Sequence, residues 1–85
     1  AHMSVRGFAR AFRREVGVTP AAYVETIRVE RAIELLQTTA ADSERIAAAC
    51  GFGTAETFRR AFRRQLGVTP GEYRDRFRGA LERAA

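Results

Sequence analysis

Arginine is the residue type with the clearest potential for binding chemistry, because all fifteen basic residues of this chain are Arg. The guanidinium group offers donors in a planar fork that fits phosphate oxygens and the edge of guanine. Many of the Arg fall in two related segments, residues 8–23 and 58–73, which are identical at eleven of sixteen aligned positions. Each copy predicts a basic helix with two Phe on one side, followed by Gly and Thr-Pro. Such helices, in a chain of formal net charge +5, indicate nucleic acid as the partner.

Residues suited to catalysis, metal binding or membrane insertion are scarce. The chain has one Cys, Cys50, and one His, His2, which excludes an internal disulfide and offers no set of metal ligands. No nucleophile and base pair, glycine-rich phosphate loop or carboxylate pair stands out, so we predict no catalytic activity and no cofactor. No apolar run has the length of a membrane span, and no signal peptide is visible. We therefore expect a protein of the cytoplasm that is not an enzyme.

Helix caps and breakers predict five helices and no strand, so the expected fold class is all-α in a single domain of residues 1–85. Each helix follows a Ser or Thr cap or begins at a Pro, and most end at a Gly. The predicted helices span residues 5–16, 20–37, 44–50, 55–66 and 70–83. The predicted N-caps are Ser4, Ser43 and Thr54. A buried apolar stripe is expected along the second helix at Val29, Ala32, Ile33 and Leu36.

Residues 43–67 have the layout of a helix-turn-helix. The run Gly51-Phe52-Gly53 permits a tight reversal, and Phe52 is expected to fill the gap between the two helices. The second of these helices should pack through Phe58 and Phe62, which lie one turn apart on one face. These rings could instead stack on single-stranded bases, but their helical spacing favours core packing. The residues left facing outward are Ala55, Glu56, Thr57, Arg59, Arg60 and Arg63.

The sequence of residues 46–54, together with Phe58, Phe62, residues 67–70 and Tyr73-Arg74, resembles the DNA-binding domain of the AraC/XylS transcription regulators. Residues 28–36 are similar to the linker helix of that family. The sequence of residues 50–62 looks most like that of the branch whose sensor is an amidotransferase-like domain. The resemblance covers nearly the whole chain, and it implies two homeodomain-like helix-turn-helix units joined by a long helix.

Only one of the two implied units is expected to be complete. Residues 43–67 form the complete unit, residues 20–37 the linker helix and residues 70–83 the C-terminal helix. Residues 1–4 align with residues 51–54, inside the turn of that unit. Residues 1–17 are therefore expected to be the remnant of a first unit that lacks its two preceding helices.

The resemblance implies sequence-specific binding of double-stranded DNA by a bacterial transcription regulator, with two recognition helices in adjacent major grooves. Carried over position by position, the base-reading residues of the family fall on Val5, Arg6, Ala9, Arg10, Glu56, Thr57, Arg59 and Arg60. Val5 and Ala9 offer only apolar contact, for example to a thymine methyl group. Phosphate contacts are expected from caps at helix N-termini and from Arg one turn further along. These candidates are Ser4, Arg13, Ser43, Thr54 and Arg63.

Two other interpretations stay open. The chain could be a basic helical module that docks on an acidic protein such as RNA polymerase, which activators of the family also contact, or it could bind nucleic acid without sequence preference. The incomplete first unit has a further consequence. Phe8 and Phe12 should lack the helix that would cover them, so we expect self-association through the first repeat and a lowered affinity for DNA.

Overall fold

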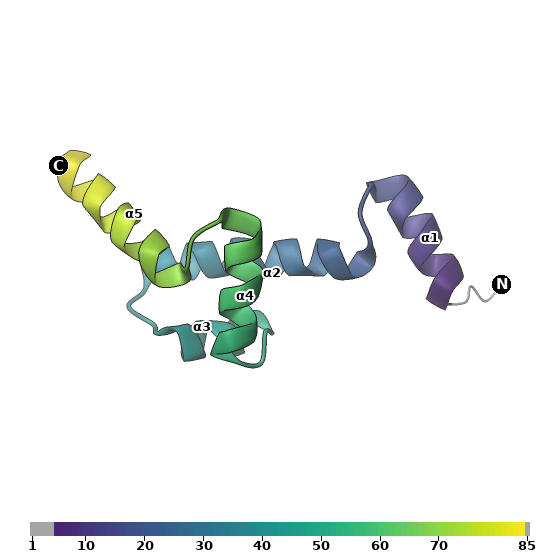
Figure 1. Cartoon of the computed structure of the whole chain (residues 1–85), viewed down its shortest axis with the longest axis horizontal. Helices are drawn as coiled ribbons and strands as arrows, with labels where there is room; N and C mark the ends of the chain where they lie inside the picture. The colour runs from purple at the N-terminus through teal and green to yellow at the C-terminus, as the bar shows by residue number, and fades with distance from the viewer. Residues whose placement is uncertain (1–4, 85) are drawn as a thin grey trace.

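This computed structural model describes residues 5–84, which form five α-helices and the short loops between them (Figure 1). They are α1 (Val5–Val16), α2 (Pro20–Thr38), α3 (Ser43–Cys50), α4 (Ala55–Leu66) and α5 (Pro70–Ala84). Because no strand occurs in this part of the chain, the predicted all-α class is confirmed. α2 and α5 each continue one residue beyond the predicted end. In α2 the side chain of Thr38 bonds back to the carbonyl of Glu34 at 2.7 Å, which keeps Thr38 in the last turn.

The predicted start of the third helix was wrong by one residue. Asp42, and not Ser43, is the N-cap of α3, since its carboxylate accepts the backbone N–H of Arg45 at 2.9 Å. Asp caps a helix as well as Ser does, and its charge also suits the positive end of the helix dipole. Ser43 is therefore the first residue of α3. The predicted cap Ser4 lies outside the described residues.

The cap of α4 is the predicted one, because the hydroxyl of Thr54 accepts the backbone N–H of Thr57 at 3.1 Å. α2 has an equivalent cap, in which the hydroxyl of Thr19 accepts the N–H of Ala22 at 3.2 Å. α3 ends at Gly51 with φ +86°, a left-handed conformation that a residue with a Cβ adopts at a cost.

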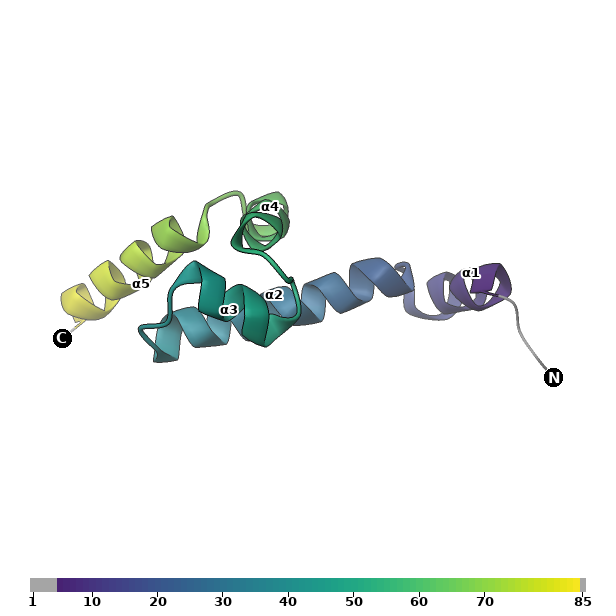
Figure 2. The same ribbon diagram turned by 90° about the horizontal axis from the view of Figure 1, so that it is seen from below.

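The core lies where α3 and α4 pack on the C-terminal half of α2 (Figures 1 and 2). α2 contributes three residues of the predicted apolar stripe, and α3 and α4 contribute two aromatic and several small or branched side chains. Ile33, the fourth residue of the stripe, is half-buried against this cluster. The buried residues are Val29, Ala32, Leu36, Ile46, Ala47, Cys50, Phe58, Ala61 and Phe62.

α1 takes no part in this core. In both views it lies alone at the N-terminal end of α2, whereas α3, α4 and α5 gather around the other half of that helix (Figures 1 and 2). The result is an elongated molecule of 55 × 25 × 19 Å. None of the helices in residues 5–84 has the length and apolar character that a membrane crossing requires.

Candidate nucleic-acid interface

α4 is held in place by its two Phe, which leaves its basic side exposed. Phe58 and Phe62 are both 0% exposed. Their rings lie 5.6 Å apart edge to face, and Phe52 from the preceding turn approaches Phe58 at 5.2 Å between ring centroids. The small side chains of Ala47 and Ala61 are also buried, which lets α3 and α4 approach closely. Phe52, Phe58 and Phe62 thus occupy the positions that the sequence predicted for them.

The opposite side of α4 is polar, and the predicted base-reading residues lie on it. Glu56 and Arg60 are both exposed and form an ion pair of 2.6 Å between carboxylate and guanidinium. Thr57 is also exposed, and its hydroxyl accepts a hydrogen bond from the hydroxyl of Thr54 at 2.9 Å. A shallow hollow on this side of α4 also brings Arg59 and Arg63 together with Arg60. The structure therefore places the four predicted base-reading side chains of α4 on one continuous exposed surface.

The equivalent residues of α1 are also accessible. Arg6, Arg10 and Arg13 are exposed, and Ala9 is half-buried. The predicted base-reading residue Val5 begins α1, but its side chain lies outside the described part. α1 thus presents a second row of Arg, although nothing among residues 5–84 covers its aromatic side as α3 covers that of α4.

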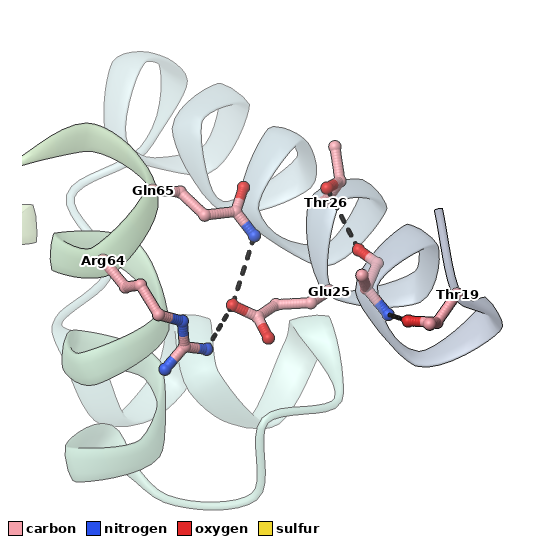
Figure 3. A network of polar contacts seen from close by, with 6 residues as sticks. Thr19, Glu25, Thr26, Arg64 and Gln65 are labelled. Carbon is pink, nitrogen blue, oxygen red and sulfur yellow. Dashed lines mark hydrogen bonds and ion pairs between the residues drawn. The ribbon is translucent and has the colours of Figure 1, made fainter. Parts of the chain in front are cut away.

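A polar network connects the first half of α2 to α4. Figure 3 shows Glu25 of α2 between Arg64 and Gln65 of α4. The Glu25 carboxylate forms an ion pair with Arg64 and accepts a hydrogen bond from the Gln65 side chain at 3.2 Å. The hydrogen bond from Arg64 is the main cause that lowers the pKa of Glu25. This network adds a polar contact between the first half of α2 and the end of α4 to the apolar packing of the core.

α5 closes the other end of α2. The guanidinium of Arg74 donates to three backbone carbonyls, those of Leu36 at 3.2 Å, Thr39 at 3.0 Å and Ala41 at 2.8 Å. These oxygens belong to the last turn of α2 and the loop before α3, where backbone acceptors have no partner within a helix. Arg74 therefore holds the segment that leads into the helix-turn-helix.

The adjacent Tyr73 secures α5 further. Its ring lies edge to face against Phe62 at 5.7 Å, and its hydroxyl accepts a hydrogen bond from the side chain of Gln37 at 2.8 Å. Tyr23, the equivalent residue of the first repeat, lies 5.5 Å from Phe12 between ring centroids. Both Tyr thus join the helix after Thr-Pro to the Phe of their own repeat.

Some contacts at this interface were missed in the sequence, although one of them has a recognisable pattern. The spacing of Thr69 and Glu72 is that of a capping box. The Glu72 carboxylate accepts from the hydroxyl of Thr69 at 3.0 Å and from its backbone N–H at 3.3 Å. The hydrogen bond from the Thr69 hydroxyl is the main cause that lowers the pKa of Glu72. No comparable pattern indicated the contact between Glu25 and Arg64, because these residues are distant in sequence.

The described residues contain little else that could carry chemistry. They bring together no group of three or more His, Cys, Asp or Glu suited to a metal ion. Cys50 is buried, and this burial raises the pKa of its thiol, which favours the unreactive protonated form. The exposed basic surfaces of α1 and α4 are thus the features that suggest a function.

The sequence and the structure are both similar to known proteins. The model of a family described as a helix-turn-helix domain matches residues 1–76. The HTH-type transcriptional regulator Rv1931c of Mycobacterium tuberculosis is 54% identical over 57 residues, which are 67% of this chain and 22% of that protein. The chain thus spans about a fifth of the length of this curated relative.

Two solved structures share the arrangement of the helices. The DNA-binding domain of AdpA, a global transcriptional factor solved in complex with a target DNA, superposes with a TM-score of 0.87 and 39% sequence identity. That match covers 93% of this chain and 71% of the AdpA chain. An AraC-type transcriptional regulator from Chromobacterium violaceum superposes with a TM-score of 0.76 and 33% identity, over 85% of this chain and 64% of that one.

Proposed function

The chain belongs to the family of AraC-type helix-turn-helix domains, and we propose that it binds a specific double-stranded DNA site as part of a bacterial transcription regulator. The observation that supports this most is the geometry of α4. Its Phe58 and Phe62 are fully buried against α3, while Glu56, Arg59 and Arg60 are exposed on the opposite side. A rigidly held helix with an exposed row of Arg suits insertion into a major groove.

In this proposal α4 reads base edges through four side chains. Arg59 and Arg60 donate to guanine, Glu56 accepts from cytosine, and Thr57 contacts either type of base pair. Thr54 and Arg63 hold phosphates at the two ends of the contact, and Ser43 adds a phosphate contact at the start of α3. The exposure of Glu56, Arg59, Arg60 and Arg63 supports these assignments.

α1 contributes a second set of contacts in the adjacent major groove. Arg6 and Arg10 read base edges, Val5 and Ala9 make apolar contacts, and Arg13 holds a phosphate. Ser4 is the remaining phosphate contact predicted from the sequence. Because α2 carries both recognition helices, one chain can bind an asymmetric site without forming a dimer.

The proposal is tested by selecting duplexes from a randomised pool and comparing a selected duplex with a scrambled version of equal composition. Fluorescence anisotropy, measured over a series of salt concentrations, gives the affinity and its salt dependence for both. If α4 reads two base pairs at about 1–3 kcal/mol each, the selected duplex should bind at least roughly 30-fold more tightly.

Equal affinity for the two duplexes would overturn the proposal in favour of nonspecific nucleic-acid binding. Absence of salt-dependent binding to either duplex would instead favour the protein-interaction module. Both results are clear because the phosphate contribution depends steeply on salt and does not depend on sequence. The same titration therefore separates all three interpretations.

We also infer two properties of the whole protein from the family. It acts in the cytoplasm, where its DNA is, and a form that activates transcription contacts RNA polymerase. The net charge of +5 supports such a contact with an acidic surface. DNA binding has no need for catalysis, and the proposal assigns none to this chain.

We further propose that the chain self-associates through the first repeat. Phe8 is 51% exposed, Tyr23 44% and Ile27 47%, so apolar side chains from both α1 and α2 face solvent. Exposed apolar surface on adjoining helices favours association with a second copy. Val16 and Val18, at the junction of these helices, are also exposed and extend the apolar surface.

A further inference from the structure

A groove with a volume of about 340 Å³ separates the first half of α2 from α4. Its polar side chains are Glu25 and Arg28 from α2 and Thr57, Arg60 and Arg64 from α4. Thr57 and Arg60 are also proposed to read bases. The groove therefore opens beside the proposed DNA-contacting surface, and a ligand bound there would continue that contact toward α2.

The three guanidinium groups of this groove differ in their partners. Arg60 is paired with Glu56 at 2.6 Å, and Arg64 is paired with Glu25, as Figure 3 shows. Within the described part of the chain, the guanidinium of Arg28 has neither an ion-pair nor a hydrogen-bond partner, although the side chain is exposed. Arg28 is therefore the cation in the groove with all its donors available to an anion.

The position of Arg28 is defined by the turn between α3 and α4. A Cβ added to Gly51 would meet its Nε at 3.1 Å and its Cζ at 3.4 Å, so the guanidinium lies against the backbone of the turn. The turn immediately precedes the N-terminus of α4, where unpaired N–H groups favour negative charge. Gly51 is the C-cap of α3, and Thr57 in the first turn of α4 lines the groove with Arg28, so the guanidinium lies beside the end of α3 and the start of α4.

A DNA duplex supplies an anion at this place. Two adjacent major grooves on one face of B-DNA are separated by the minor groove and the sugar-phosphate backbones on either side of it. If α1 and α4 occupy the two major grooves, the part of α2 between them faces these backbones. We propose that Arg28 binds a phosphate of the backbone next to the major groove that α4 occupies. This inference rests on the proposed function, and it adds a phosphate contact from the linker helix.

The experiment uses the selected and scrambled duplexes and substitutes Arg28→Ala. Affinity should fall several-fold and by the same factor on both, and the slope of log affinity against log salt concentration should shrink by about 0.9. Arg28→Lys should retain most of the slope, because it keeps the charge. Arg78→Ala is the matched control, since Arg78 occupies the equivalent place of the second repeat and is exposed on α5. It should leave the slope unchanged.

Failure of this inference can be distinguished from failure of the proposed function. If the unmodified chain binds both duplexes equally, the proposed function is wrong. Suppose instead that the chain prefers the selected duplex, that circular dichroism shows Arg28→Ala to be folded, and that this variant keeps the full salt slope. In that case only the Arg28 contact is wrong. Tight saturation of Arg28 by inorganic phosphate without DNA, observed by NMR at its Nε–H, would identify a site for a free anion and also overturn the proposal.

Discussion

Phe58 and Phe8 occupy the same position in the two repeats, yet Phe58 is 0% exposed and Phe8 is 51% exposed. The helices that carry them are identical at six of twelve aligned positions, with the same Phe pair, and the same Gly-Val-Thr-Pro follows each of them. The difference lies in what covers them. In the second repeat α3 packs on the aromatic side, whereas in the described residues the only cover of α1 comes from α2, chiefly through Tyr23. Burial in such a unit thus depends on the partner helix rather than on the recognition helix alone.

The two repeats differ in a second way, in the helix that begins at the Pro of each. In the second repeat Arg74 and Glu72 make polar contacts that secure the start of α5 and the loop before α3. The equivalent positions of the first repeat are Val24 and Ala22, which cannot make such contacts. The second unit is therefore fixed by packing and by hydrogen bonds, and the first by a few ring contacts. Substitutions at equivalent positions test this comparison.

The largest expected difference is between Phe62→Ala and Phe12→Ala. Phe62→Ala should destabilise the chain by about 3–5 kcal/mol, because it leaves a cavity between α3 and α4. A domain of this size has roughly 5–10 kcal/mol of stability in all, so this variant should be largely unfolded at body temperature. Phe12→Ala should cost only about 1–2 kcal/mol, since its ring is half-buried. Urea denaturation followed by circular dichroism measures both, and equal losses would contradict the comparison.

Arg74→Ala should have the next largest effect. Its guanidinium donates to three carbonyls at the end of α2 and in the loop before α3, and the loss of these charged hydrogen bonds should cost about 1.5–3 kcal/mol. Hydrogen exchange should become faster in α3, because the loop no longer holds its start. The control is Val24→Ala at the equivalent position, which should change stability by less than about 0.5 kcal/mol. Equal effects of the two substitutions would show that the hydrogen bonds of Arg74 do not stabilise the loop before α3.

These contacts illustrate what the sequence could predict. The all-α class, the Thr54 cap and the Phe58 and Phe62 packing all follow from local spacing, because helix period and caps depend on residues a few positions apart. The exposed α4 surface follows from the same periodicity. The sequence also placed the cap of α3 one residue too late, at Ser43. Ser43 and Asp42 are adjacent and cap equally well, so residue type alone could not choose between them.

The contacts that join the helices were beyond this kind of prediction. Glu25 with Arg64, Arg74 with the carbonyl of Leu36, and Arg28 with the Gly51 turn each link positions far apart in sequence. Each depends on the crossing geometry of two helices, which helical periodicity does not fix. An exposed Arg on a helix is compatible with solvent, an ion pair or a ligand. Only the arrangement of the helices distinguishes these possibilities.

Base recognition should also differ between the repeats. Arg60→Ala should cost about 1–3 kcal/mol on the selected duplex and relax the preference at one base pair. Arg10→Ala should cost less, because α1 is held at only one side and its Arg cannot be positioned as firmly. Binding to duplexes with single base-pair changes measures both effects. Equal loss on selected and scrambled DNA would remove Arg60 from the base-reading set.

Arg63→Ala provides the contrast to Arg60 within the same helix. It should weaken binding to every duplex alike and reduce the salt slope by about one. The reason is that Arg63 lies a turn further along the exposed side of α4, where a phosphate contact is expected. A selective loss on one sequence would instead make Arg63 a base-reading residue.

Substitution on the exposed aromatic side of α1 should weaken self-association, by less than the effects predicted above. Phe8→Ser should weaken the association of two chains by about 0.8–1.5 kcal/mol per Phe, half the value of a fully buried side chain. Sedimentation equilibrium of the unmodified chain and this variant measures the change. Leu81→Ser is a suitable control, because Leu81 is 54% exposed but lies on α5. If the unmodified chain is strictly monomeric, or if Leu81→Ser has the same effect, association does not involve the first repeat.

The smallest expected effect concerns Glu25, which links α2 to α4 through Arg64. The pKa of Glu25 is lowered in the folded chain, so its contribution to stability is present above the usual Glu pKa of about 4.3 and is lost as pH falls through the lower folded value. Arg64 is 64% exposed, so the pair is worth at most about 0.2–1 kcal/mol. Glu25→Gln should therefore lower the melting temperature slightly near pH 6, and the difference from the unmodified chain should shrink as the pH falls below about 4.3. Glu15→Gln, at an exposed position with no ion-pair partner among the described residues, is the control measured over the same pH range. A difference for Glu25→Gln that stays constant from pH 6 to pH 3 would mean that this carboxylate is not stabilised by Arg64, and that α2 and α4 are not joined by charge.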